Sequence, residues 1–233
     1  MKRILLAVFA VFCFFNGVSQ ASQSHLIPDA AHVAARSGYQ EKLRYTFRDA
    51  YKKDVVLQAL IMPSFGSEYV IGLRRASGGY EVFHQAVEFK VSIFERIERE
   101  GAGDGEVWEY TLPKNLPKDF RRNPINMIER TIEAPLAIRI ADIWAEALLD
   151  VRRGRGGDLS LDGIYYTYSM FLNGYGFVSG SSNNPRPDTK MYALAQIVEA
   201  LKKYAQGDLV FEELENIVAL YEKNFLGQIK SSQ

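Results

Sequence analysis

Five acidic residues are the first candidates for chemistry, because paired carboxylates can hydrolyse glycosides with one acting as general acid. They fall into two groups that are far apart in the chain: Glu95, Glu98 and Glu100, and then Asp158 and Asp162. Sequence separation says nothing about their separation in space, and a perturbed environment would be needed to make any of them reactive. A cell-envelope hydrolase acting on a glycan or peptide is therefore the alternative function for this chain.

Other catalytic templates find no match. The three histidines are His25, His32 and His84, and only His84 lies in a stretch with strand-like alternation. There is no His-Glu-x-x-His pair for zinc, no G-x-S-x-G nucleophile elbow and no glycine-rich phosphate loop. We therefore predict no catalytic residue, no cofactor and no metal site.

A polar segment, SGSSNNPRPD at residues 179–188, is the candidate binding loop. It has no apolar side chain to bury except its prolines, and polar loops between rigid elements often carry binding groups. The alternative is a solvated connection in which Asp188 or Thr189 caps the next helix. The candidate binding residues are Ser181, Ser182, Asn183, Asn184 and Arg186.

The aromatic stretch LDGIYYTYSMFLNGYGFVSG at residues 161–180 predicts a hairpin that positions this loop. Asn173-Gly174 is typical of a two-residue type I′ turn, which would place Phe171 opposite Gly176 and Met170 opposite Phe177. Strand alternation would then put six side chains on the core face: Tyr166, Tyr168, Met170, Leu172, Tyr175 and Phe177. A ligand-stacking platform is the competing interpretation of these rings.

The N-terminus has the layout of a secretory signal. Lys2 and Arg3 precede an apolar run from Ile4 to Phe15, which is too short to span a bilayer, and Ser19-Gln20-Ala21 offers small residues at the cleavage positions. We expect cleavage after Ala21 and delivery to the periplasm or the medium.

Removing that segment changes the composition of the chain. The only cysteine, Cys13, is lost, so a mature chain has no disulfide, and an exported protein without disulfides suits a bacterial envelope. The segment carries two of the 28 basic and none of the 28 acidic residues, which leaves 26 against 28 and a net charge of −2. This balance favours neither nucleic acid nor an anionic surface as partner.

Periodicity predicts the elements of one globular α+β domain over residues 41–228, after a signal peptide at 1–21 and a partly ordered lead-in at 22–40. Residues 55–63 (VVLQALIMP) read as a buried strand, and two β-rich runs flank a turn at Ala76–Gly79. Because tight-turn hairpins dominate, we expect an antiparallel sheet. Four helices are expected, packed mainly on one face: 41–54, 135–152, 188–206 and 210–225.

The second half of the chain resembles a known group. Trp144 followed by a basic pair, Leu161-Asp162-Gly163 before a tyrosine-rich strand, a Gly-Tyr-Gly turn, and a helix ending in Lys203-Tyr204-Ala205-Gln206-Gly207 are similar to an uncharacterised family of exported, signal-peptide-bearing proteobacterial proteins. The resemblance covers about residues 134–207. It implies export and a mixed fold, and it brings no catalytic residues.

These observations favour a non-catalytic function. We expect an exported bacterial protein that acts by binding, with a protein partner in the cell envelope and no membrane span once the signal is removed. No second stretch of the sequence is apolar enough to cross a bilayer.

Overall fold

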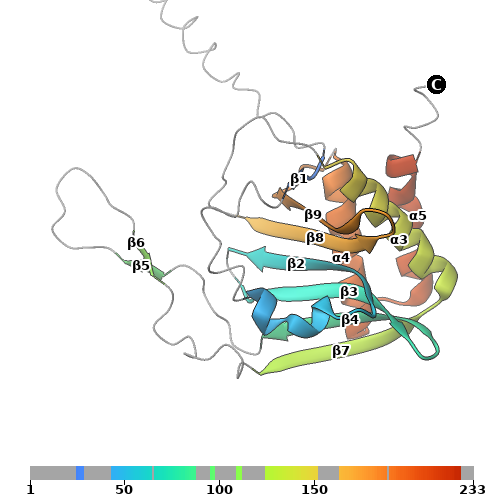
Figure 1. The fold of residues 1–233 in the computed structure, drawn as a ribbon, viewed down its shortest axis with the longest axis horizontal. Helices are drawn as coiled ribbons and strands as arrows, with labels where there is room; N and C mark the ends of the chain where they lie inside the picture. The colour runs from blue at the N-terminus through green and yellow to red at the C-terminus, as the bar shows by residue number, and fades with distance from the viewer. Residues whose placement is uncertain are drawn as a thin grey trace, which may run out of the picture.

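An antiparallel sheet forms the centre of the protein. The computed structural model describes residues 25–28, 43–64, 66–87, 124–151, 163–187 and 189–226, and the backbone alone at 95–97, 109–111 and 224–226. The strand order is β1-β9-β8-β2-β3-β4-β7 (Figure 1), with every neighbouring pair antiparallel. The strands of this sheet are β1 (Ile27–Pro28), β2 (Val55–Pro63), β3 (Tyr69–Ala76), β4 (Gly79–Val87), β7 (Ile125–Ile132), β8 (Ile164–Leu172) and β9 (Gly176–Asn183). A separate ladder pairs β5 (Glu95–Ile97) with β6 (Glu109–Thr111).

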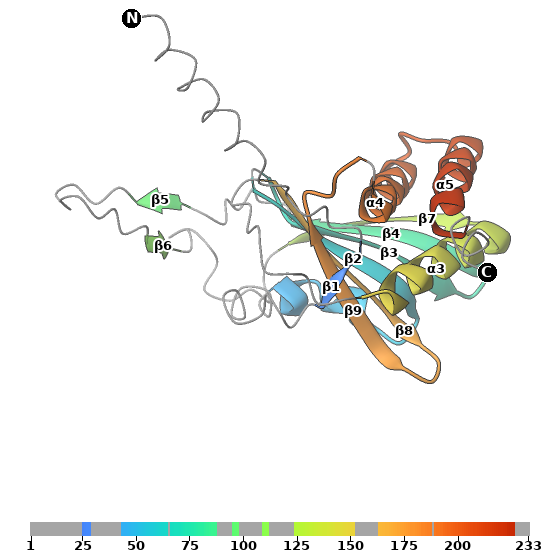
Figure 2. The same ribbon diagram turned by 90° about the horizontal axis from the view of Figure 1, so that it is seen from above.

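Three helices cover one face of the sheet, which we call the helix face. They are α3 (Ala134–Leu149), α4 (Lys190–Gln206) and α5 (Phe211–Leu226), and Figure 2 shows them together on one side. The predicted α+β class, the antiparallel sheet and the predominance of helices on one face are confirmed. The strand predicted at 55–63 coincides with β2, and the turn at Ala76–Gly79 joins β3 to β4.

The main core lies between these helices and the sheet. Trp144 of α3 is fully buried and meets the ring of Tyr168 edge-on, with 5.4 Å between ring centroids. Tyr168 also stacks on Tyr166 at 5.9 Å. Around these rings the core is completed by aliphatic side chains from the strands and helices: Leu57, Ile61, Ile71, Leu73, Val82, Leu136, Ile140, Leu194, Val198 and Leu201. Apolar burial on this face therefore joins all three helices to the central strands.

The first predicted helix is wrong in its length and regularity. In place of a helix over 41–54, residues 43–46 form one helical turn and η1 (Arg48–Tyr51) is a 3-10 helix, after which Lys52 is extended. This segment packs Leu43, Phe47 and Ala50 on the face opposite the helix face, against Phe83 and other apolar side chains. The helical segment ends before Val55 because Val55 and Val56 begin β2, and β-branched residues favour a strand.

The hairpin of β8 and β9 exists, but its predicted register is wrong by one residue. Leu172 pairs with Gly176 and Phe171 with Phe177, so the loop contains three residues instead of two. The Tyr175 N–H donates to the Leu172 carbonyl over 3.1 Å, and Gly174 and Gly176 both have positive φ angles. Among the described non-glycine residues only Asn184 has a positive φ, so Asn173 does not form the type I′ turn, which needs positive φ at both centres.

This shift changes which rings are buried. A one-residue slip moves every side chain of a strand to the other face of the sheet. Tyr166, Tyr168 and Met170 of β8 are in the main core as predicted. Phe177 and Tyr175 are not: their side chains are 58% and 71% exposed. The core assignment of those two residues is therefore wrong.

The predicted lead-in contributes an edge strand. Ile27 pairs with Ser181, and Leu26 is fully buried in the main core. Gly180 makes this contact possible, because a Cβ at that position would lie 2.8 Å from Val151 Cγ2 and 2.9 Å from Leu26 Cβ. The rest of 22–40 lies outside the described residues, as does the predicted signal peptide.

Candidate functional site

The predicted binding residues do not form one loop. Ser181, Ser182 and Asn183 belong to β9, and the first two are buried, whereas Asn184 and Arg186 are exposed beyond its end. The prediction of a loop over 179–188 is therefore wrong for 179–183, where a segment without large apolar side chains forms the outer part of the hairpin. Thr189 Oγ1 accepts the Tyr192 N–H at 3.1 Å, so the predicted capping of the next helix is confirmed.

Asn184 closes the end of this hairpin. Its Oδ1 accepts the Ile164 N–H at 2.8 Å, and its own N–H donates to the Ile164 carbonyl at 3.0 Å. Beside it, Ser64 and Gly163 exchange hydrogen bonds, with 2.9 Å between Ser64 Oγ and each of the Gly163 carbonyl oxygen and amide nitrogen. Asn184 therefore joins the end of β9 to the start of β8, and the Ser64–Gly163 hydrogen bonds join the end of β2 to the residue before β8.

The side chains of the five predicted carboxylates all lie outside the part of the chain that the structure describes. Glu95 lies in β5, where only the backbone is described, and Glu98, Glu100, Asp158 and Asp162 lie outside the described residues. Within the part of the chain that the structure describes, no group of three or more His, Cys, Asp or Glu residues is arranged to hold a metal ion.

A polar cluster missed by sequence reasoning lies between α4 and the sheet. Tyr69 of β3 donates its hydroxyl hydrogen to Glu199 Oε1 over 2.6 Å, and Lys202 Nζ lies 4.2 Å from the centre of the Tyr69 ring. Lys202 Nζ is also 3.9 Å from Glu199 Oε2. The two charged side chains are partly exposed, so the cluster reaches solvent along α4.

His84 is the buried member of this cluster. It lies on β4 with its ring centroid 5.4 Å from that of Tyr69, and only 5% of the residue is exposed. Neither ring nitrogen has a hydrogen-bond partner among the described residues. Burial, with a smaller contribution from the positive charge of Lys202, lowers the pKa of His84 to about 4. The imidazole is therefore neutral at pH 7.

The tyrosines of the cluster are held in their neutral form. Burial, and then the negative charge of Glu199, raises the pKa of Tyr69 far above its usual value and that of Tyr166 to about 12. A neutral phenol can donate to Glu199, as Tyr69 does, but it is a poor base at pH 7. The arrangement suits a role in seating α4 on the sheet through a hydrogen-bonded carboxylate and a cation over an aromatic ring.

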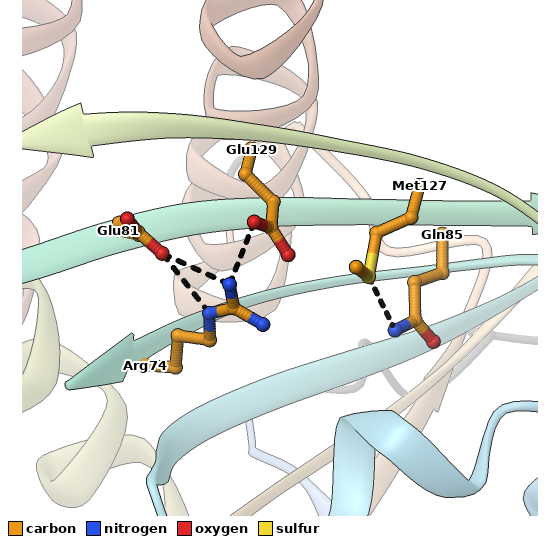
Figure 3. Close-up of polar contacts among 5 residues, drawn as sticks. All are labelled: Arg74, Glu81, Gln85, Met127 and Glu129. Carbon is orange, nitrogen blue, oxygen red and sulfur yellow. Dashed lines mark hydrogen bonds and ion pairs between the residues drawn. The ribbon is translucent and has the colours of Figure 1, made fainter. Parts of the chain in front are cut away.

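A second charged group lies on the opposite face of the sheet (Figure 3). The Arg74 guanidinium contacts Glu81 Oε2 at 3.0 Å and Glu129 Oε2 at 2.6 Å, which links β3, β4 and β7. Nearby, Gln85 Nε2 donates to the sulfur of Met127 over 3.2 Å. All three charged side chains are about a quarter exposed, so solvent screening keeps the gain from these ion pairs small.

The loop end of β8 and β9 carries three exposed aromatic rings. We call Phe171, Tyr175 and Phe177 the aromatic tip; their exposed fractions are 62%, 71% and 58%. Phe171 and Phe177 are directly opposite each other in the ladder, so their rings share one face. In Figure 2 the loop joining β8 to β9 projects beyond the neighbouring strands.

Comparison of the chain with protein-family models, with curated proteins and with solved structures found no match in any of the three. Within the described residues, none of the helices has the length and apolar character needed to cross a membrane. The site must therefore be judged from its geometry. In the polar cluster Tyr69, Glu199 and Lys202 contact one another, whereas the aromatic tip has large apolar surface that the fold leaves exposed.

Proposed function

We propose that this protein is an exported, non-catalytic binding protein of the bacterial cell envelope, and that the aromatic tip is its contact surface. The observation that carries the proposal is the exposure of more than half of each of three neighbouring aromatic residues. Grouped apolar exposure of this kind marks interaction sites, whereas apolar residues exposed singly need no explanation.

The position of the tip supports the same function. Tyr166, Tyr168 and Met170 anchor the same strand in the main core, so the hairpin presents its outer rings from a rigid base. The ladder fixes the backbone of the Phe171–Phe177 pair, so that loop ordering adds little to the cost of binding. Aromatic residues are enriched in binding surfaces because they bring large contact area with few rotatable bonds.

Retention on envelope material tests this function. The tagged mature chain should sediment with a total cell-envelope fraction that contains both membranes and their proteins. The variant Phe171→Thr/Tyr175→Ser/Phe177→Thr should lose most of this retention, because it removes the exposed rings and keeps β-branched residues in the strands. Leu220→Gln is the matched control, since Leu220 is 60% exposed on α5, away from the tip.

Equal retention of the wild type, the tip variant and the control would contradict the tip as contact surface. Failure of the wild type to sediment at all would contradict the proposed function. Circular dichroism and thermal melts of each variant confirm that the fold is intact before binding is compared.

Export gives a separate prediction about the N-terminus. Expression in a Gram-negative host should yield a periplasmic chain that begins at Ser22, because signal peptidase reads the small residues Ser19 and Ala21. Intact-mass measurement of the chain released by osmotic shock checks this. A chain that keeps Met1 and stays with the cytoplasmic fraction would contradict export and leave the tip to be tested on its own.

A further inference from the structure

The aromatic tip has too little surface for a stable protein interface by itself. A fully buried phenylalanine or tyrosine covers about 150–250 Å², so three rings that are each more than half exposed offer roughly 300–400 Å² of contact surface. A specific protein–protein interface buries about 800 Å² on each partner. A projecting group of this size can bind in a deep pocket of a partner, or it can insert into a deformable apolar surface.

The residue composition of the hairpin favours insertion into a deformable apolar surface. From Gly163 to Pro185 the sequence contains no Asp, Glu, Lys, Arg or His, so no charge would lose its hydration if the tip entered an apolar medium. The turn satisfies part of its own backbone, since the Tyr175 N–H donates to the Leu172 carbonyl. The hairpin therefore has no charged group for the polar rim of a protein interface, and the polar side chains that its loop exposes, Asn173 and Tyr175, are uncharged.

The residue types of the tip also suit a water–lipid boundary. Tyr175 lies in the loop, and the rings of Phe171 and Phe177 lie on the strand ends beside it. A tyrosine combines an apolar ring with a hydroxyl that needs water or a headgroup, and such residues are enriched at membrane–water interfaces. Leu172 and Val178, on the other face, pack against the core and hold the tip to the domain.

We propose that the aromatic tip inserts into the headgroup boundary of a lipid bilayer, so that the protein is a peripheral, reversibly attached membrane protein. This inference rests on the proposed function, since it names the partner of the same surface. The binding is driven by apolar contact and not by charge, and a bilayer of neutral, zwitterionic lipid is sufficient. A single small tip gives weak and reversible attachment, as a single short lipid anchor does.

Sedimentation with protein-free vesicles of pure phosphatidylcholine tests the proposal. The mature wild-type chain should bind, and Phe171→Thr/Phe177→Thr should weaken binding by about tenfold or more, since two of the three inserting rings are lost. Leu220→Gln should bind as the wild type does. Raising the salt concentration to about 1 M, where the Debye length is only about 3 Å, should leave the binding unchanged.

The other outcomes each overturn the inference in a different way. Binding only to vesicles that contain phosphatidylglycerol, lost in high salt and equal in the tip variant, would show attachment by charge elsewhere. No binding to any vesicle, with tip-dependent retention on the envelope fraction, would show a protein partner and leave the proposed function standing. No binding to vesicles and no retention on envelope material would remove both.

Discussion

Replacing Tyr168 by alanine should lower the free energy of unfolding by about 3–5 kcal/mol, the usual cost of deleting a large buried ring. Tyr168 is fully buried, meets Trp144 edge-on and stacks on Tyr166. Its removal leaves a cavity among three elements that pack through it, β8, β2 and α3. Since a small domain is stable by about 5–15 kcal/mol, chemical denaturation at pH 7 should resolve the change clearly.

Phe177→Ala is the matched control for that measurement. Phe177 is on the adjacent strand of the same hairpin but is exposed, and it is paired with Phe171 in the ladder. A cross-strand aromatic pair at the surface contributes about 0.2–1 kcal/mol, so the loss should stay within that range. Losses of similar size for Tyr168→Ala and Phe177→Ala would contradict the three-residue loop and restore the two-residue register.

The sequence predicts the parts of the fold in which one pattern dominates. VVLQALIMP is recognisable as β2 without alternation between polar and apolar residues, because six of its nine residues are buried and the other three are partly buried. The broad stripe of Leu136, Ile140, Ile143 and Trp144 predicts α3 within a few residues of its bounds. Gly207, which has a positive φ and ends α4, was likewise identifiable as a stop.

Strand β7 was missed because it lies at the edge of the sheet. Its residues INMIERTI show no strict alternation, because Met127 and Ile128 are adjacent and so are Glu129 and Arg130, and most of the strand is at least partly exposed. The stretch runs directly into α3, whose apolar stripe beginning at Leu136 is the stronger signal, and no element is predicted over 125–132. In the structure β7 holds the α4–α5 junction to the sheet, because one guanidinium nitrogen of Arg130 donates to the carbonyls of Tyr204 and Leu209.

The hairpin register was wrong because Asn-Gly predicts the place of a turn better than its length. A second glycine, Gly176, adopts the positive φ that a three-residue loop can use, and local sequence does not decide between the two loops. The alternative that leaves Phe171 and Phe177 outside is selected by packing, since Val178 then meets the main core. For this reason the sequence does not predict that Tyr175 and Phe177 are exposed beside Phe171.

The polar cluster could not be predicted either. Tyr69 and Glu199 are 130 positions apart, and each has an ordinary setting in the sequence: a tyrosine at the start of a strand and a glutamate on an amphipathic helix. Their contact depends on how α4 crosses the sheet. His84 was placed on the correct strand by alternation, but the lack of a partner for its imidazole follows only from the tertiary packing.

That buried imidazole should make stability depend on pH. In the unfolded chain His84 titrates near its usual pKa of about 6.5, whereas in the folded protein its pKa is about 4, so the unfolded state binds more protons between these values. The contribution of neutral His84 is complete above about pH 6.5 and is lost as the pH falls towards 4. Each pKa unit corresponds to about 1.4 kcal/mol, which gives a loss of about 2 kcal/mol by pH 5 and about 3 kcal/mol by pH 4.

The variant His84→Phe isolates this effect, because phenylalanine has a similar ring and no proton to gain. It should be at least as stable as the wild type at pH 7, since replacing an unpaired buried polar group with an apolar one removes a desolvation cost. Urea denaturation at pH 7, 6 and 5 should show the wild type losing stability relative to the variant by about 2 kcal/mol over that range. The difference between the unfolding free energies of the two proteins at each pH removes the contribution of the carboxylates that both contain. Parallel pH profiles of the two proteins would mean that His84 has the same pKa in the folded and the unfolded chain. Water would then have to reach the imidazole beside Tyr69 and Lys202 in the folded protein.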